Sequence, residues 1–306
     1  MTFAHTLAID KAGCSLIACF GVNFRCTHDN SFEMIMNENC IGRKHKVRAF
    51  FVTIPHSGEM IPPGADWLQG LPEAVVMRDV DRFVDQIYQP VIKKLKLPNI
   101  LAKCHRYVID LNRKPDEFDT DSVEGAPHPA GTHPKGLHWS VTTFGEKLII
   151  KPMSKGLHDL FVQQHYLPFH ESVAEMAKSF NSKPVFHLDL HSMPSQGTAL
   201  HNDPGAQRAD VVVSDFHGKS ARKDFVDVII EAYRSAGLQV AYNWPYFGGG
   251  ITQMYGRPDL GHHTVQVELN RRLYMDEATK QKSSQFVETQ NKLTHAMELI
   301  FASLPT

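Results

Sequence analysis

The chain lacks an excess of charge of either sign. Its 306 residues carry 32 Lys and Arg against 33 Asp and Glu, which leaves a formal net charge of −1. Nucleic-acid-binding domains normally carry a basic excess on one face, so this balance argues against that class. At about 150 residues per domain, the length corresponds to about two domains or one large α/β domain.

Cysteine is scarce, and its spacing fits no metal or disulfide framework. The five cysteines are odd in number and include no C-x-x-C pair, so a zinc ribbon and a disulfide-rich secreted fold are unsupported. The N-terminus has no basic segment, and the apolar residues 16–22 are too few to span a membrane. These features predict a cytoplasmic protein that associates with no membrane.

Three common catalytic signatures are also missing. The sequence has no G-x-x-x-x-G-K-[ST] loop, no G-x-S-x-G elbow and no H-E-x-x-H helix. Histidine, in contrast, is abundant, with 18 residues. Because histidine suits metal binding and proton transfer near neutral pH, the question is which histidines form a site.

Hydrophobic periodicity predicts strands that alternate with helices. Strands are expected at residues 47–54, 100–111, 185–191, 237–241 and 265–269, and helices at 79–97, 154–180, 219–236 and 278–303. Pro90 and Pro168 are expected to kink or interrupt their helices. The alternation indicates an α/β fold around a mostly parallel or mixed sheet.

Two segments stand apart from this pattern. Residues 1–46 show no clean period and are expected to be an appendage of unknown role, ahead of a single domain of residues 47–306. Residues 114–140 are polar and rich in Pro, Gly and His, and so long a loop is usually functional or disordered.

Polar residues cluster where the predicted strands end. In open α/β sheets, ligands bind outside the carboxyl ends of the strands, and here these ends carry His56, Asp110–Arg113, Asp189–Ser192 and Gln266–Arg271. Three His, Asp or Glu ligands with one open position make a typical catalytic metal site, which this set could supply. The run Gly248–Gly250 does not have phosphate-loop spacing and is expected to allow close backbone approach or a tight turn.

Six segments resemble the N-formylglutamate amidohydrolase family over residues 47–277. They are IPHSGEMIPP, RDVDRFVD, HRYVIDLNR, LDLHSMP, SDFHG and NWPYFGGGITQMYGRPDLGHHTVQVELNRRLYMDE. The resemblance implies a zinc-exopeptidase (phosphorylase/hydrolase-like) architecture of the zinc-carboxypeptidase type. In this α/β fold, helices sandwich a mixed, mostly parallel sheet. It also implies one bound Zn²⁺ ion.

The resemblance implies that His56 and His191 are zinc ligands. The third ligand is Asp81 or Glu59, with Asp81 preferred because it begins the D-x-x-V-D pattern of the family. Alternative interpretations are a loop or core role for the histidines, a helix-terminal charge for Asp81 and a solvated position for Glu59. Asp189 is expected to orient a ligand histidine.

The resemblance also implies a general base and a substrate-binding pair. Glu268 matches the general base. Burial in its apolar strand would raise its pKa. The alternative interpretation is that Glu268 forms a buried salt bridge with a neighbouring arginine. Asn112 and Arg113 match the pair that binds the substrate carboxylate, for which the arginine fork is suited, and a structural ion pair is the alternative. A second carboxylate needs a second cationic group, for which the candidates are Arg257 and Arg106, with a surface ion pair as the alternative. His263 and Tyr255 could line the pocket or polarise the carbonyl.

Most other histidines are expected to bind no metal. His128, His133 and His138 lie in the long polar loop, a candidate lid. His158 and His165 are expected on one solvated helix face.

The predicted function is that of a zinc-dependent amidohydrolase. It would cleave the N-formyl or N-acyl amide of an acidic amino acid, above all N-formyl-L-glutamate, to L-glutamate and formate, a step of histidine degradation. The alternatives are a zinc carboxypeptidase or other N-acyl-amino-acid deacylase, and a non-catalytic protein that binds an acidic ligand. The expected partner is a small-molecule N-acyl amino acid, with no nucleic acid.

Overall fold

The computed structural model describes residues 48–117, 119, 121–125 and 135–305, and the backbone of residues 22–26 and 32–36. The chain divides into two compact units, Met1–His45 and Lys46–Thr306. In the first unit, strands β1 (Val22–Cys26) and β2 (Phe32–Met36) pair antiparallel. The rest of the predicted appendage lies outside the described residues.

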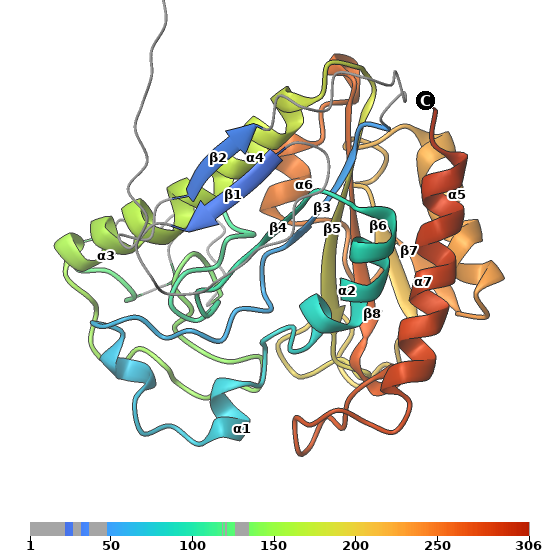
Figure 1. Cartoon of the computed structure of the whole chain (residues 1–306). Coiled ribbons are helices and arrows are strands. Elements are labelled where there is room, and N and C mark those ends of the chain that lie inside the picture. Colours follow the sequence, from blue (N-terminus) through green and yellow to red (C-terminus); the bar gives the residue numbers. More distant parts are fainter. Residues whose placement is uncertain are drawn as a thin grey trace, which may run out of the picture. The chain divides into compact units, whose positions relative to one another are not determined.

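A six-stranded sheet forms the centre of the second unit (Figure 1). Its order is β4 (Asn99–Leu101), β3 (Phe50–Ile54), β5 (Val185–Met193), β8 (His262–Asn270), β6 (Val211–Ser214) and β7 (Val240–Tyr242). The first four strands are parallel, and β6 is antiparallel to β8 but parallel to β7. The predicted fold class, a mixed and mostly parallel sheet between helices, is confirmed.

Helices cover both faces of this sheet (Figure 1). One face packs against α2 (Val84–Leu95), α5 (Lys223–Ser235) and α7 (Phe286–Ser303), and the other against α4 (Leu167–Ser179) and α6 (Gly250–Tyr255). The remaining helices are short: α1 (Glu73–Val76), α3 (Lys155–Phe161), and the 3-10 turns Asp66–Leu68, Pro258–Leu260 and Arg271–Leu273.

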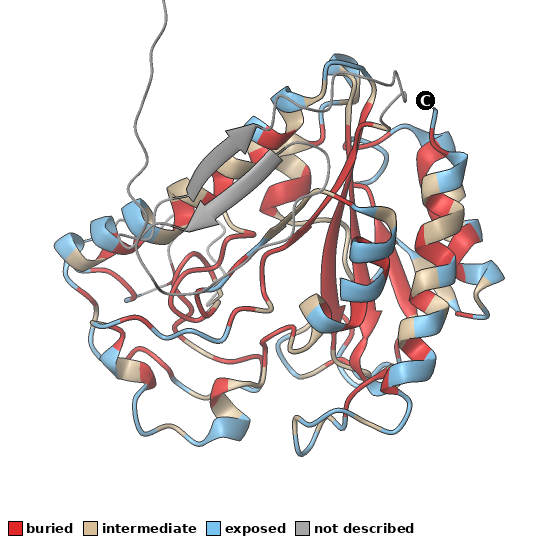
Figure 2. Ribbon diagram, viewed as in Figure 1, coloured by how far each residue is buried: buried red, intermediate tan, exposed pale blue. Residues whose placement is uncertain are grey.

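The two faces of the sheet differ in chemistry. In β5, Phe186, Leu188 and Leu190 join the hydrophobic core formed with α2, α5 and α7. Because side chains alternate along a strand, His187, Asp189 and His191 share the opposite face, as predicted. These polar side chains are also buried, and the central strands are enclosed on both sides (Figure 2). The sheet therefore has one apolar buried face and one polar buried face.

One predicted strand is mostly turns, and one observed strand was not predicted. Within the region predicted as strand up to residue 111, only Asn99–Leu101 is a strand, and turns follow it. The apolar side chains that suggested a strand, such as Tyr107 and Ile109, are buried within those turns. Strand β6 is absent from the prediction, because its four residues are too short a run to identify.

Two helical segments differ from the prediction, and the backbone explains both differences. Helix α2 starts at Val84 rather than near residue 79, because Phe83 has a left-handed backbone with φ of 69°. Pro168 does not break the chain of helices. The π-helical segment Val162–Tyr166 joins α3 to α4, and Pro168 stands in the first turn of α4, where a missing N–H is tolerated.

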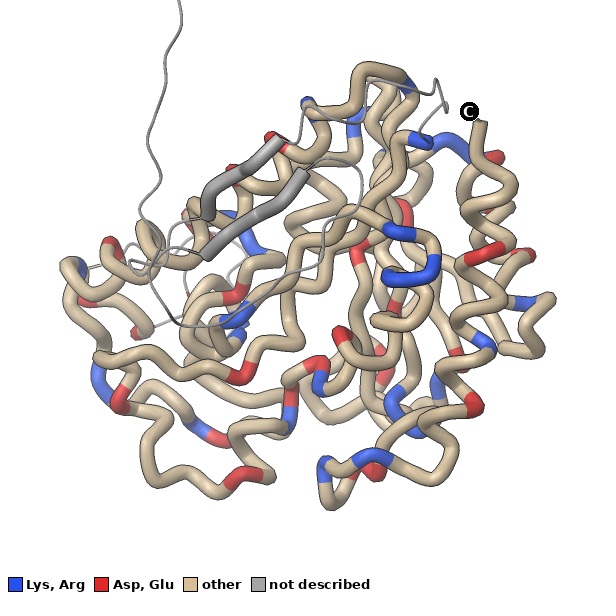
Figure 3. Tube along the Cα trace, in the orientation of Figure 1, with Lys and Arg blue, Asp and Glu red and all other residues tan. Residues whose placement is uncertain are grey.

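Charged residues of both signs are interspersed along the described part of the second unit (Figure 3). This distribution agrees with the balanced composition. Among the described residues, no helix has the length and apolar character that a membrane crossing requires.

Candidate active site

The site lies at the carboxyl ends of the central parallel strands. His56 follows β3, His191 lies near the end of β5, and Glu268 pairs with His191 from the adjacent strand β8. Asp81 precedes α2 and reaches the same point. A cavity of about 440 Å³ opens there, and these four side chains line it together with Arg106, Asn112 and Arg113.

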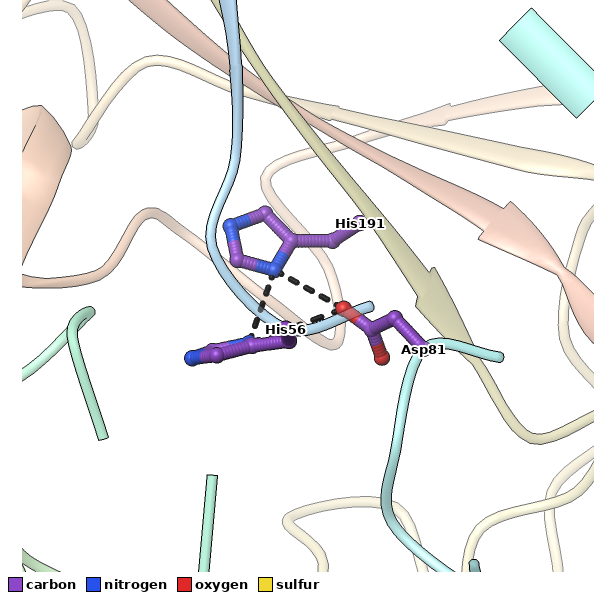
Figure 4. A group of neighbouring side chains, drawn as sticks. All are labelled: His56, Asp81 and His191. Atoms are coloured by element: carbon purple, nitrogen blue, oxygen red, sulfur yellow. Dashed lines mark hydrogen bonds and ion pairs between the residues drawn. The ribbon is translucent and has the colours of Figure 1, made fainter. Parts of the chain in front are cut away.

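Three buried side chains each bring one atom to a common point (Figure 4). His191 Nδ1 lies 3.1 Å from both His56 Nδ1 and Asp81 Oδ2, and His56 Nδ1 lies 3.5 Å from Asp81 Oδ2. Ligands at about 2.0–2.2 Å from a tetrahedral Zn²⁺ would be about 3.3–3.6 Å apart. The observed separations therefore fit a small divalent cation after little adjustment.

Carboxylates hold both histidines from behind. His56 Nε2 lies 2.7 Å from Asp110 Oδ1, and His191 Nε2 lies 2.8 Å from Asp189 Oδ2. With the ring proton on Nε2, each Nδ1 presents its lone pair to the shared point, which is the usual arrangement behind metal-binding histidines. Asp189 stands where the sequence suggested, whereas Asp110 was noted only among the polar residues at the strand ends.

Asp81, and not Glu59, reaches the two histidines. Arg271 Nη2 donates to Asp81 Oδ1 at 3.0 Å, which leaves Oδ2 directed at the histidines. Burial raises the pKa of Asp81, but hydrogen bonds with His191 and His56 outweigh it and hold the pKa well below its ordinary value. Glu59 instead accepts from Arg82 Nε at 2.9 Å and lines a separate depression.

Glu268 is a buried carboxylate fixed by one neighbour on its own strand. Burial raises its pKa, and the charge of His191 opposes only part of this rise. Gln266 Nε2 donates to Glu268 Oε1 at 2.8 Å, while Gln266 Oε1 accepts from Gly249 N at 2.8 Å and from Asn112 Nδ2 at 3.3 Å. Because its oxygen faces two donors, the Gln266 amide group must direct its nitrogen at Glu268. Its position two residues before Glu268 on the same face was the available sequence signal.

The glycine run allows close approach to the Asn112 side chain. A Cβ atom on Gly249 would lie 2.2 Å from Asn112 Nδ2, so only glycine fits there. Ile251 N also donates to Asn112 Oδ1 at 2.8 Å. The close approach predicted for these glycines is therefore made to a neighbouring side chain of the protein.

Two of the arginines of the pocket wall, Arg106 and Arg113, are held differently. Arg106 donates to Asp110 Oδ2 at 2.9 Å and to the backbone oxygen of Asp79 at 2.9 Å. Arg113 donates only to backbone oxygens, from Nε to Lys135 at 2.9 Å and from Nη1 to Asn112 at 3.0 Å. Arg113 therefore presents a charge that no carboxylate of the described residues neutralises by a salt bridge.

The structure does not bring Arg257, His263 or Tyr255 to this pocket. Arg257 is exposed and forms a salt bridge with Asp259 at 3.1 Å. The His263 ring stacks on Phe186. The Tyr255 hydroxyl lies 2.9 Å from His170 Nδ1. For His263 the cause is strand geometry: it is the second residue of β8, and at the usual rise per residue Glu268 lies about 17 Å further along. It also faces the opposite side of the sheet from Glu268, because the two positions differ by an odd number.

Other histidines are mainly buried structural residues. His138 Nε2 lies 2.9 Å from His158 Nδ1, and both side chains are buried. The prediction that His158 lies on a solvated face is therefore wrong, and His138 belongs to the interior rather than to a lid. His128 and His133 lie outside the described residues.

Comparisons with known proteins agree on one family. The model of the N-formylglutamate amidohydrolase family matches residues 48–275. The N-formylglutamate deformylase of Pseudomonas aeruginosa is 27% identical over 237 residues, 74% of this chain and 82% of that protein. The deformylase of Pseudomonas putida is 27% identical over 230 residues, 74% of this chain and 81% of that protein.

Two solved structures share the fold. The crystal structure of N-formylglutamate amidohydrolase from Ralstonia eutropha JMP134 has 25% identity and a TM-score of 0.74, with 85% of this chain and 95% of that chain covered. The gene product Atu2144 from Agrobacterium tumefaciens has 17% identity and a TM-score of 0.62, over 84% of this chain and 91% of that chain.

Proposed function

The chain belongs to the N-formylglutamate amidohydrolase family, and we propose that it hydrolyses N-formyl-L-glutamate to L-glutamate and formate with the help of a zinc ion. The relatives named N-formylglutamate deformylase support the reaction, and the site supports the chemistry. As the sequence suggested, such a reaction would serve histidine degradation in the cytoplasm.

One observation carries this proposal: the convergence of His56, Asp81 and His191 beside a buried carboxylate, Glu268. Two imidazole nitrogens and one carboxylate oxygen form a ligand set that suits zinc and leaves one position open. When bound, zinc would polarise the amide carbonyl and lower the pKa of a water molecule.

Glu268 would move the proton. As water adds to the formyl carbon, the carboxylate accepts a proton from it, and then delivers this proton to the amine nitrogen as the C–N bond breaks. Burial, which raises the pKa of Glu268, makes it a better proton acceptor than an exposed glutamate. Gln266 would hold one carboxylate oxygen, so that the other is directed to the reaction.

The cationic wall would bind and stabilise the substrate. Arg113, which no described carboxylate neutralises, would hold the α-carboxylate with its planar fork. Arg106 would add positive charge near the carbonyl oxygen, where negative charge develops in the transition state.

A substrate panel tests this function. We expect formate release from N-formyl-L-glutamate to exceed the cleavage of N-acetyl-L-glutamate, other N-formyl amino acids and short peptides. The matched variant is Glu268→Gln, which keeps the side-chain shape but cannot accept the proton. It should lose about 10²–10⁴ in kcat while its metal content stays unchanged. Preference for a peptide, or a near-normal rate in the variant, would contradict the proposal.

A further inference from the structure

Lys135 is a second cation of the pocket wall that forms no salt bridge with a described residue. Its Nζ donates to the backbone oxygen of Leu200 at 3.0 Å. By contrast, two arginines that line the same cavity are neutralised, Arg106 by Asp110 at 2.9 Å and Arg271 by Asp81 at 3.0 Å. Among the described residues, the cations of this wall that form no salt bridge with a carboxylate are therefore Arg113 and Lys135.

The surroundings of Lys135 favour an anion. Burial lowers the pKa of Lys135, and the positive charges of Arg113, Arg106 and Arg208 lower it further, while the negative charge of Asp79 opposes part of this fall. A cation held near other cations, and partly removed from water, gains most when an anion binds beside it.

His201 adds a neutral donor to the same part of the wall. Thr198 N donates to His201 Nδ1 at 3.0 Å, so the proton of the neutral ring is on Nε2. Burial and the charges of Arg208 and Lys135 lower its pKa to about 4. Near neutral pH, His201 is thus an uncharged N–H donor that lines the cavity.

A chain of contacts orders these groups along the wall. Asn112 Nδ2 lies 3.3 Å from His191 Nε2, and Arg113 follows Asn112 in sequence. Arg113 donates to the backbone oxygen of Lys135, and the Lys135 amine donates to the backbone oxygen of Leu200.

The substrate has its groups in a matching order. In N-formylglutamate, only the nitrogen and the α-carbon separate the formyl carbon from the α-carboxylate. The side-chain carboxylate is further away by the methylene groups.

We propose that Lys135, assisted by His201, binds the side-chain carboxylate of the substrate, while Arg113 binds the α-carboxylate. This subsite would make the enzyme select acidic amino acids over neutral ones, and it rests on the proposed function. Lys135 would take the role that the sequence suggested for Arg257.

The test compares N-formyl-L-glutamate with N-formyl-L-glutamine, which has the same shape but no side-chain charge. Lys135→Met should lower kcat/KM for the glutamate substrate about 100-fold. It should leave the rate on the glutamine substrate nearly unchanged, which also shows that the variant folds. Lys135→Arg should restore the preference. The control Lys151→Met, at an exposed position, should behave as the wild type.

A complementary measurement uses the α-amide of N-formylglutamate. Arg113→Met should abolish the preference for the free α-carboxylate and keep the preference for the side-chain carboxylate. If Lys135→Met retains the glutamate preference, or slows both substrates equally, the subsite is overturned while the deformylase function stands. If the wild type cleaves neither substrate, the proposed function itself fails, and the subsite fails with it.

Discussion

His56 and His191 each have one ring nitrogen fixed by a carboxylate, Asp110 at 2.7 Å and Asp189 at 2.8 Å. At the scale of the residue, these contacts determine that Nδ1, and not Nε2, of each ring faces the point shared with Asp81. The same logic holds for Asp81, whose Oδ1 accepts from Arg271 while Oδ2 faces the histidines. The ligand atoms are therefore oriented before any metal binds.

Replacing Asp189 should weaken metal binding. In Asp189→Asn, the amide oxygen can still accept from His191 Nε2, but the negative charge that makes the ring more basic is lost. We expect the affinity for zinc to fall about tenfold or more, as measured by competition with a chromogenic chelator. The exposed Asp159→Asn serves as the control, and equal affinity in the two variants would show that Asp189 has no such role.

Sequence motifs could identify residues whose role lies in their own side-chain chemistry. His56, Asp81, His191 and Glu268 were proposed in this way, and the structure brings them together. Gln266 was not singled out, because its role depends on which group its amide faces in the folded chain. Nothing in the sequence indicated that Lys135, within a polar loop, faces the cavity.

At the scale of the element, the segment Gly248–Gly250 connects Asn112 in the pocket wall to Glu268. Gly249 N donates to Gln266, which donates to Glu268, and the start of α6 binds the Asn112 side chain. A displacement of this segment would therefore disturb two groups of the site at once.

Gly249→Ala should damage both activity and stability. The added Cβ would lie 2.2 Å from Asn112 Nδ2, and the amide group of Asn112 is itself tied to Ile251. We expect a loss of about 1–3 kcal/mol in the free energy of unfolding, measured with urea, and a lower kcat.

The matched control for this substitution is Gly156→Ala in α3. No atom lies within 4 Å of a Cβ placed on Gly156. This variant should keep its activity and keep or gain up to about 1 kcal/mol of stability. Equal behaviour of the two alanine variants would show that the contact with Asn112 is unimportant.

Periodicity predicted the long elements well and the short ones badly. In strand β5 and the centre of β8, apolar residues alternate with polar ones over a stretch long enough to recognise. The turns after β4 were predicted as strand because tertiary packing buries their apolar side chains. The same limit explains His263: it is close to Glu268 in sequence, yet a strand carries the two apart.

At the scale of the whole molecule, most of the described histidines are buried in the interior. Burial lowers the pKa to about 4 for five histidines and to about 3 for His187. The five are His105, His138, His170, His201 and His262. These rings are neutral in the folded protein near pH 7, so the high histidine count reflects packing more than catalysis.

This predicts a specific loss of stability in acid. An unfolded histidine binds a proton below a pKa of about 6.5, whereas these folded residues do so only near pH 4 or below. Their contribution is therefore complete above about pH 6.5 and is lost as the pH falls towards 4. Each fully buried ring could account for up to about 3 kcal/mol.

Thermal unfolding measured between pH 7.5 and 4.5 would check this. The midpoint should fall steeply below about pH 6.5. His295→Gln, at an exposed position of α7, should leave the slope unchanged. A midpoint that stays constant down to pH 5 would refute the neutral, buried state of these histidines.

The group formed by His56, Asp81 and His191 is what would make this chain a metal-dependent deformylase. The decisive experiment follows formate release from N-formyl-L-glutamate by the purified protein, before metal removal, after removal by a chelator, and after zinc is returned. We expect activity to disappear with the metal and to return with about one equivalent of zinc per chain. An unchanged rate in protein shown to be free of metal would contradict this role.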